Sequence, residues 1–200
     1  MHLGSLGAYS LLLLTVAVAM ASCGKSDDKS TDNPSGPSIT PTTFFSTMEN
    51  LTVEVVYEVG AKPFTDIPNR ELNPWEILRQ NLAAVFETGA SEPDITVPFE
   101  LAEMTEIPAR NDEVITSTEI LNLATQYQSA PSSLTDVKFM ILFFNGYLDD
   151  GTGNPDKNVI GVSLTGTTII GMFKPVINAN DSPFPVVARF VEQSTLVHEM

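Results

Sequence analysis

The chain has 200 residues and 42% of them are hydrophobic, so it can bury the core of one domain with appendages. Its 25 acidic and 10 basic residues give a net charge of −15. A chain this acidic repels nucleic-acid phosphates, which excludes nucleic acid as a partner. The chain has one cysteine, so an intrachain disulfide is also excluded.

The first chemical signal is the position of that cysteine. Residues 11–20 form an apolar run, LLLLTVAVAM, which is too short to span a membrane comfortably. The small residues Ala21 and Ser22 follow, and then Cys23. This arrangement resembles a bacterial lipobox, in which the cysteine is lipidated and becomes the mature N-terminus. The resemblance implies a signal peptide at 1–22 and a membrane contact through an N-terminal lipid.

The segment departs from the lipobox pattern in two ways. Met20 stands where the motif expects leucine, and no Lys or Arg precedes the apolar run. An ordinary secretory signal with a chance cysteine is therefore the alternative. Because Gly24 rather than aspartate follows the cysteine, the resemblance implies a lipoprotein of the outer membrane, facing the periplasm or the surface.

The next segment is poor in apolar residues. Residues 24–43 are dominated by Ser, Thr, Asp, Gly and Pro, and ordering them would cost entropy without burial in return. We therefore expect a lipidated cysteine and flexible tether at 23–50, followed by the folded part at 51–200.

The folded part begins with a strand and a helix. Residues 53–59 are rich in β-branched side chains and are followed by Gly60, which predicts a strand. Asn73 is a good N-cap and Pro74 suits the first helical position, which predicts a helix over 74–88. Its core face is expected to carry Trp75, Leu78, Leu82, Val85 and Phe86.

A second strand and a second helix follow. Residues 95–104 predict a strand, with Pro98 indicating an edge position or a break. Thr116 and Glu119 form a capping box for a short helix. That helix carries its apolar side chains at Ile120, Leu121, Leu123, Ala124 and Tyr127.

The central part predicts a layered sheet. Residues 137–144 are almost continuously apolar, which is typical of a central strand covered on both faces. Residues 158–164 and 167–173 predict two further strands. Thr165 and Gly166 between them favour a hairpin. The expected fold class is α/β (α+β), with a mixed twisted sheet of about five strands and helices packed on it.

The last predicted helix carries a chemical pattern. Ser182 is the expected N-cap and Pro183 the first-turn residue. The predicted core stripe consists of Val187, Phe190, Val191, Ser194, Val197 and His198. His198 and Glu199 match the first half of the zinc-protease motif H-E-x-x-H. The alternative is a helix-terminal His and Glu that face solvent.

The chain from 51 to 200 resembles the N-terminal part of a zincin metallopeptidase, of metzincin-like type. In that family a mixed sheet of about five strands precedes the active-site helix, and the strand before the last is antiparallel. The resemblance implies a zinc-dependent endopeptidase acting on peptide or protein substrates. It also implies that the second histidine, four positions after His198, lies past the residues given. The chain would then be incomplete, inactive by itself and unable to bind zinc tightly.

The resemblance assigns roles to particular residues. His198 would be the first zinc ligand and Glu199 the general base that activates the metal-bound water. The strand containing Val159, Ile160, Gly161 and Val162 would form the edge of the cleft and pair with an extended substrate. A plain hairpin arm is the alternative for this strand.

Two further candidates are weaker. The loop 149–156 is rich in oxygen ligands, but it departs from the EF-hand pattern, and a turn explains it better than a calcium site. The acidic residues Glu100, Glu103, Glu106, Asp112 and Glu113 are better explained as solvated charge than as a glycosidase pair. The alternative function is a non-catalytic periplasmic or surface lipoprotein that serves as a binding or scaffold module.

Overall fold

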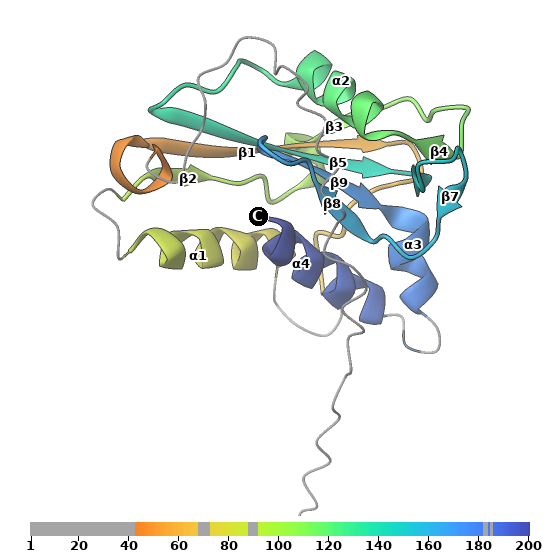
Figure 1. Ribbon diagram of the computed structural model, residues 1–200. Coiled ribbons are helices and arrows are strands. Elements are labelled where there is room, and N and C mark those ends of the chain that lie inside the picture. The colour runs from red at the N-terminus through yellow and green to blue at the C-terminus, as the bar shows by residue number, and fades with distance from the viewer. Residues whose placement is uncertain (1–42, 68–72, 88–91, 182–183, 185) are drawn as a thin grey trace, which may run out of the picture.

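A six-stranded sheet with helices on both faces organises the molecule (Figure 1). The computed structural model describes residues 43–67, 73–87, 92–181, 184 and 186–200. The sheet consists of β1 (Asn50–Glu58), β2 (Asp94–Thr96), β3 (Thr105–Ile107), β5 (Asp136–Phe144), β8 (Gly161–Ser163) and β9 (Ile169–Phe173). The helices are α1 (Pro74–Phe86), α2 (Ser117–Tyr127), α3 (Lys174–Asn178) and α4 (Val187–Glu199), with the short turns η1 (Thr43–Thr47), η2 (Leu101–Glu103) and η3 (Ala179–Asp181).

The order of the strands is β2–β1–β5–β9–β8, and β3 pairs with a later part of β1. All neighbouring strands are parallel except β8, which lies antiparallel to β9 at the sheet edge. A separate small sheet contains β4 (Val114–Ile115), β6 (Tyr147–Asp149) and β7 (Pro155–Asp156), and the sequence patterns did not predict it. The expected mixed α/β architecture is therefore confirmed at this level.

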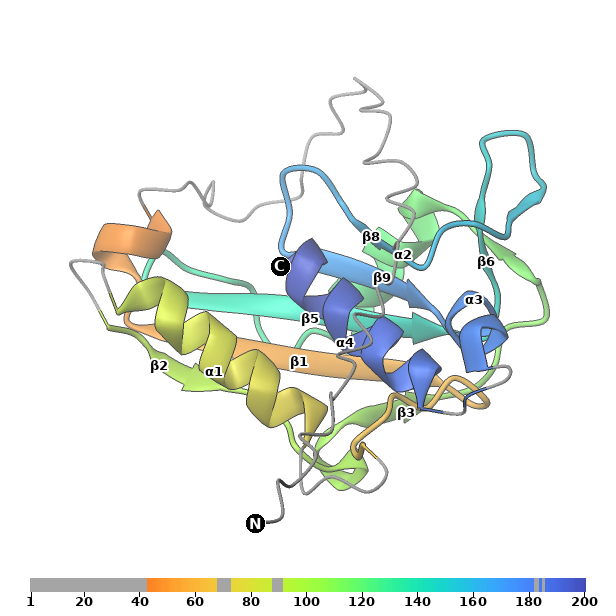
Figure 2. The same cartoon turned by 90° about the horizontal axis from the view of Figure 1, so that it is seen from below.

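Alternation along the two central strands divides the core into two layers. Side chains of one parity, such as Val53 on β1 and Phe143 on β5, pack in the cluster shared with α1 and α4. Those of the other parity, such as Val56 and Leu142, pack in the cluster shared with α2. Because both faces are covered, β5 has an almost continuously buried run, as its sequence predicted (Figures 1 and 2).

The predicted helix starts are confirmed at α1 and α2. The Asn73 side chain accepts a hydrogen bond from the Trp75 backbone N–H at 2.9 Å. Thr116 and Glu119 form the reciprocal capping box at the start of α2. Trp75 is fully buried, and its indole N–H donates to the Phe64 carbonyl at 3.0 Å, so it belongs to the core.

The second and the last of the expected strands have other bounds. The second strand is broken into β2 and β3, and Pro98 lies in the break, where a missing backbone N–H interrupts pairing. β9 begins at Ile169, because a turn from Leu164 to Thr167 precedes it, with Gly166 at a φ of 75°. The hairpin predicted from Thr165 and Gly166 is confirmed by the β8–β9 pairing.

Packed structure begins before residue 51. Met48 is fully buried, and the Phe44 ring lies 6.0 Å from the Phe139 ring, so η1 already belongs to the core. The expected tether at 23–50 therefore ends earlier than predicted. The expected signal peptide at 1–22 and the lipidation residue Cys23 lie outside the described residues.

The capping box predicts a measurable loss of stability at acidic pH. Hydrogen bonds from the Thr116 backbone N–H and hydroxyl, both 2.7 Å, hold the pKa of Glu119 below its usual 4.5. Its contribution is therefore fully present above pH 4.5 and is lost as the pH falls through the lower folded pKa. Between pH 5 and 2, roughly, we expect the unfolding free energy of Glu119→Gln to fall less than that of the wild type. Parallel curves from urea unfolding would contradict this.

Candidate functional site

Helix α4 carries the His198–Glu199 pair and packs on the sheet beside α1 and β8. Its buried residues are Ala188, Glu192 and Leu196, which are spaced four apart. The predicted core stripe was therefore wrong by about one position: Phe190 and Val197 are each 40% exposed. The reason is that the buried stripe contains a charged residue, which a search for apolar periodicity does not register.

The start of α4 also differs from the prediction. The helix begins at Val187, and Val186 at the N-cap position makes no side-chain capping bond. The predicted capping residues Ser182 and Pro183 lie outside the described residues. The separate helix α3 directly follows β9 and was not predicted.

His198 and Glu199 lie at the end of α4, which packs beside β8 at the edge of the sheet. Thr195 faces β8 so closely that a Cβ built on Gly161 would lie 2.8 Å from its Cγ2. His198 and Glu199 follow Thr195 by three and four positions, which places them on the same side of the helix, one turn further along. His198 is exposed and Glu199 is half-buried. The pair therefore lies beside the line of the edge strand and is accessible from solvent.

The edge strand is shorter than predicted. Gly161 and Val162 lie in β8 and pair with β9, whereas Val159 and Ile160 precede the strand. The Ile160 carbonyl still accepts a hydrogen bond from the Phe173 N–H at 2.9 Å, so the pairing reaches one residue further back. The other edge of β8 has no partner strand within the described residues.

Gly161 provides the close approach between β8 and α4. An added Cβ would also lie 2.9 Å from Met172 Sδ. We expect Gly161→Ala to lower the unfolding free energy by about 1–3 kcal/mol, because the helix must move away from the strand. Adding Thr195→Ser removes the clashing methyl group and should recover part of the loss. Ser163→Ala in the same strand is the control, since Ser163 is exposed. Thermal and urea unfolding measure the effect, and equal stability of all variants would contradict it.

A buried ion pair fixes α4 to the rest of the molecule, and the sequence patterns did not predict it. Lys174 Nζ lies 2.6 Å from Glu192 Oε2, and their side chains are 4% and 3% exposed. The other oxygen, Glu192 Oε1, accepts the Phe64 backbone N–H at 2.7 Å. Burial raises the pKa of the Glu192 carboxyl, and the Lys174 ammonium opposes this shift.

The loop that contains Phe64 connects three elements at this point. The Phe64 ring lies 3.5 Å from Lys174 Nζ and 4.5 Å from the Arg189 guanidinium carbon. Its carbonyl accepts the Trp75 indole N–H from α1. The relative position of α1, α3 and α4, and hence of His198, therefore depends on this loop.

The described residues contain no group of three or more His, Cys, Asp or Glu side chains that could hold a metal ion. Among the two histidines of the chain, only His198 lies in the described part. In the loop 149–156, Asp149 and Asp150 accept backbone N–H groups of the same loop, as a turn requires. The five acidic residues considered for a glycosidase pair are all exposed.

No helix in the described part of the chain is long and apolar enough to cross a membrane.

Comparisons with protein-family models, with curated proteins and with solved structures find no match for this chain. We therefore infer function from the chain's own residues and topology.

Proposed function

We propose that this chain is the N-terminal part of a zincin-like domain and supplies one side of the cleft of a zinc-dependent endopeptidase. The observation that carries the proposal is the position of His198 and Glu199, one helical turn beyond the residue that packs on an antiparallel edge strand. The sheet order supports it, because β8 is both next to last in the chain and outermost in the sheet. That is the arrangement implied by the family resemblance.

The donor chemistry suits the first half of such a site. The exposed imidazole of His198 could ligate zinc. The carboxylate of Glu199, at the next position, could accept a proton from a water on that zinc. When bound, zinc lowers the pKa of its water to about 7. Glu199 would accept the proton released by this water and pass it to the leaving amine. The remaining ligands would come from residues that follow Met200.

The edge strand suits an extended peptide. The free edge of β8 offers backbone N–H and C=O groups, which bind peptides by strand addition. A peptide at this edge would pass the solvent-accessible side of α4 that carries His198. Val162 and Ser163 in β8, with the preceding residues Val159 and Ile160, would then determine which side chains fit.

The proposal also includes a cellular location for the protein. Lipidation at Cys23 would anchor the domain to the bacterial outer membrane, and the residues that follow would act as a tether. Metabolic labelling with a radioactive fatty acid should mark the wild type and leave Cys23→Ser unlabelled. Equal incorporation into both proteins would contradict the anchor.

A binding module is the second candidate, and the same free edge of β8 favours it. Such a lipoprotein would capture an extended segment of a partner without cleaving it. The protein extended through the reading frame after Met200 separates the two candidates. We expect one equivalent of zinc per chain and cleavage of casein. A protein with neither zinc nor cleavage would exclude the peptidase and favour the binding module.

A further inference from the structure

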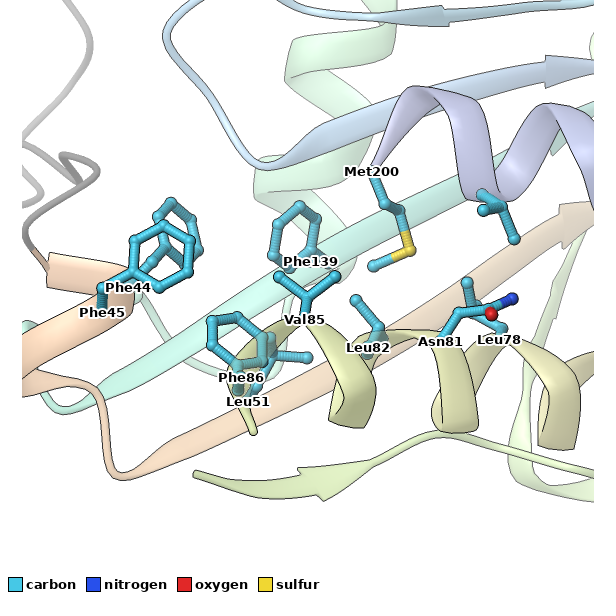
Figure 3. A pocket seen from close by; sticks show the side chains of 11 residues that line it. Phe44, Phe45, Leu51, Leu78, Asn81, Leu82, Val85, Phe86, Phe139 and Met200 are labelled. Atoms are coloured by element: carbon cyan, nitrogen blue, oxygen red, sulfur yellow. The ribbon is translucent and has the colours of Figure 1, made fainter. Parts of the chain in front are cut away.

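An apolar groove of about 310 Å³ lies beyond the end of α4 (Figure 3). Its floor comes from the sheet, at Leu51 on β1 and Phe139 on β5, and its far wall from η1. One long side is formed by α1, and Met200 stands at the near end. Ten of its eleven lining residues are apolar, and Asn81 is the exception.

The direction of α4 leads into this groove. Glu192 of α4 pairs with Lys174, beyond the end of β9, whereas Met200 packs in the groove with Phe139 near the start of β5. The helix therefore runs opposite to β5 and advances toward η1. The Met200 N–H still bonds to the Leu196 carbonyl, at 3.3 Å, so helical bonding continues through this residue.

The stripe of buried side chains on α4 is also directed toward the groove. Its buried side chains recur every four positions and reach Leu196, and Met200 is the next position of that stripe. A helix that continued on the same axis would place its core-facing side chains three or four, and again seven, positions after Met200. Figure 3 shows the space ahead of Met200 bordered by Val85 and Phe86 of α1 and by the two phenylalanines of η1.

The rim of the groove is apolar and exposed. Val85 is 53%, Phe45 44% and Val197 40% exposed. These side chains come from three elements that converge on one opening, which distinguishes them from scattered surface residues.

We propose that the turns of α4 that follow Met200 occupy this groove, with apolar side chains seated between α1, η1 and β5. This inference rests on the proposed function, because an H-E-x-x-H helix continues past the second histidine. In this arrangement the face of the continued helix toward α1 is buried. The face that carries His198 is thereby held toward β8.

Thiol labelling of two cysteine variants tests the occupant. Val85→Cys and Val59→Cys are made in the protein extended through the reading frame, since both valines are about equally exposed, at 53% and 51%, and only Val85 lines the groove. Both proteins are treated with a maleimide, and the modified peptides are identified by mass spectrometry. We expect labelling at position 85 to be at least about tenfold slower than at position 59, because a filled groove must open first.

Three results would overturn the proposal. Equal labelling rates would mean that the groove is open. Protection that weakens on dilution would mean that a second copy covers it. Protection that survives after protease removal of the residues following Met200 would mean that another part of the chain fills it. Labelling needs neither zinc nor hydrolysis, so an unprotected thiol in a zinc-containing protease contradicts the groove occupant alone. A protected thiol in a protein without zinc contradicts the peptidase alone.

Discussion

Replacing Glu192 with alanine is expected to lower the free energy of unfolding by about 3–5 kcal/mol. The change removes the carboxylate partner of the buried Lys174 ammonium and the acceptor of the Phe64 N–H. A buried charge that loses its counter-charge is destabilised by the full cost of its desolvation. Urea unfolding followed by circular dichroism measures the loss.

Two further variants test whether the unpaired Lys174 charge causes the loss of stability in Glu192→Ala. Ser194→Ala, at an exposed position of the same helix, should change the free energy of unfolding by less than about 0.5 kcal/mol, as surface substitutions usually do. Lys174→Met combined with Glu192→Leu removes both charges and keeps the volume, so it should be far more stable than Glu192→Ala alone. A Glu192→Ala protein within 1 kcal/mol, roughly, of the wild type would contradict the importance of this pair.

The second large effect is expected at Glu199. In the protein extended beyond Met200, Glu199→Gln should reduce peptide hydrolysis by a factor on the order of 10²–10⁴, because the amide cannot accept the proton of the attacking water. Zinc content should stay at the wild-type value, since Glu199 is assigned no role as a ligand. His198→Ala should instead lose zinc and activity together.

Ser194→Ala is the matched control for both variants, because Ser194 is exposed on the same helix. It should keep both zinc and activity. A Glu199→Gln protein with unchanged hydrolysis would contradict the role of Glu199 as the base, and a His198→Ala protein with full zinc content would contradict the role of His198 as a ligand.

Local signals in the sequence predicted the local structure well. Asn73, Thr116 and Glu119 were identified as capping residues because their side chains satisfy neighbouring backbone N–H groups, and these bonds form. The apolar run of β5 predicted its central position for a similar reason, since a strand covered on both faces needs apolar residues of both parities.

The features that position α4 could not be predicted from the sequence. Glu192 and Lys174 are charged, and charged residues are almost never fully buried unless they are paired. Their pairing depends on three-dimensional proximity between α3 and α4, which no local pattern encodes. The same pair explains the error in the predicted core stripe of α4. The short strands β4, β6 and β7 also escaped prediction, because two or three residues cannot establish an alternating pattern.

The role of Gly161 could likewise not be predicted from the sequence. The residue stands in a predicted strand, where glycine usually signals a bulge or a close approach of backbone. Only the position of Thr195 on α4 identifies the approach as the contact between the edge strand and the helix that carries His198. This contact is what brings the two parts of the proposed cleft together.

The most direct test of the proposed zinc peptidase is the sequence of the reading frame immediately after Met200. The proposal predicts a histidine four positions after His198, which would complete H-E-x-x-H on the solvent-accessible side of α4. Any other residue at that position, or a stop codon before it, would contradict the assignment of His198 and Glu199 as zinc ligand and general base.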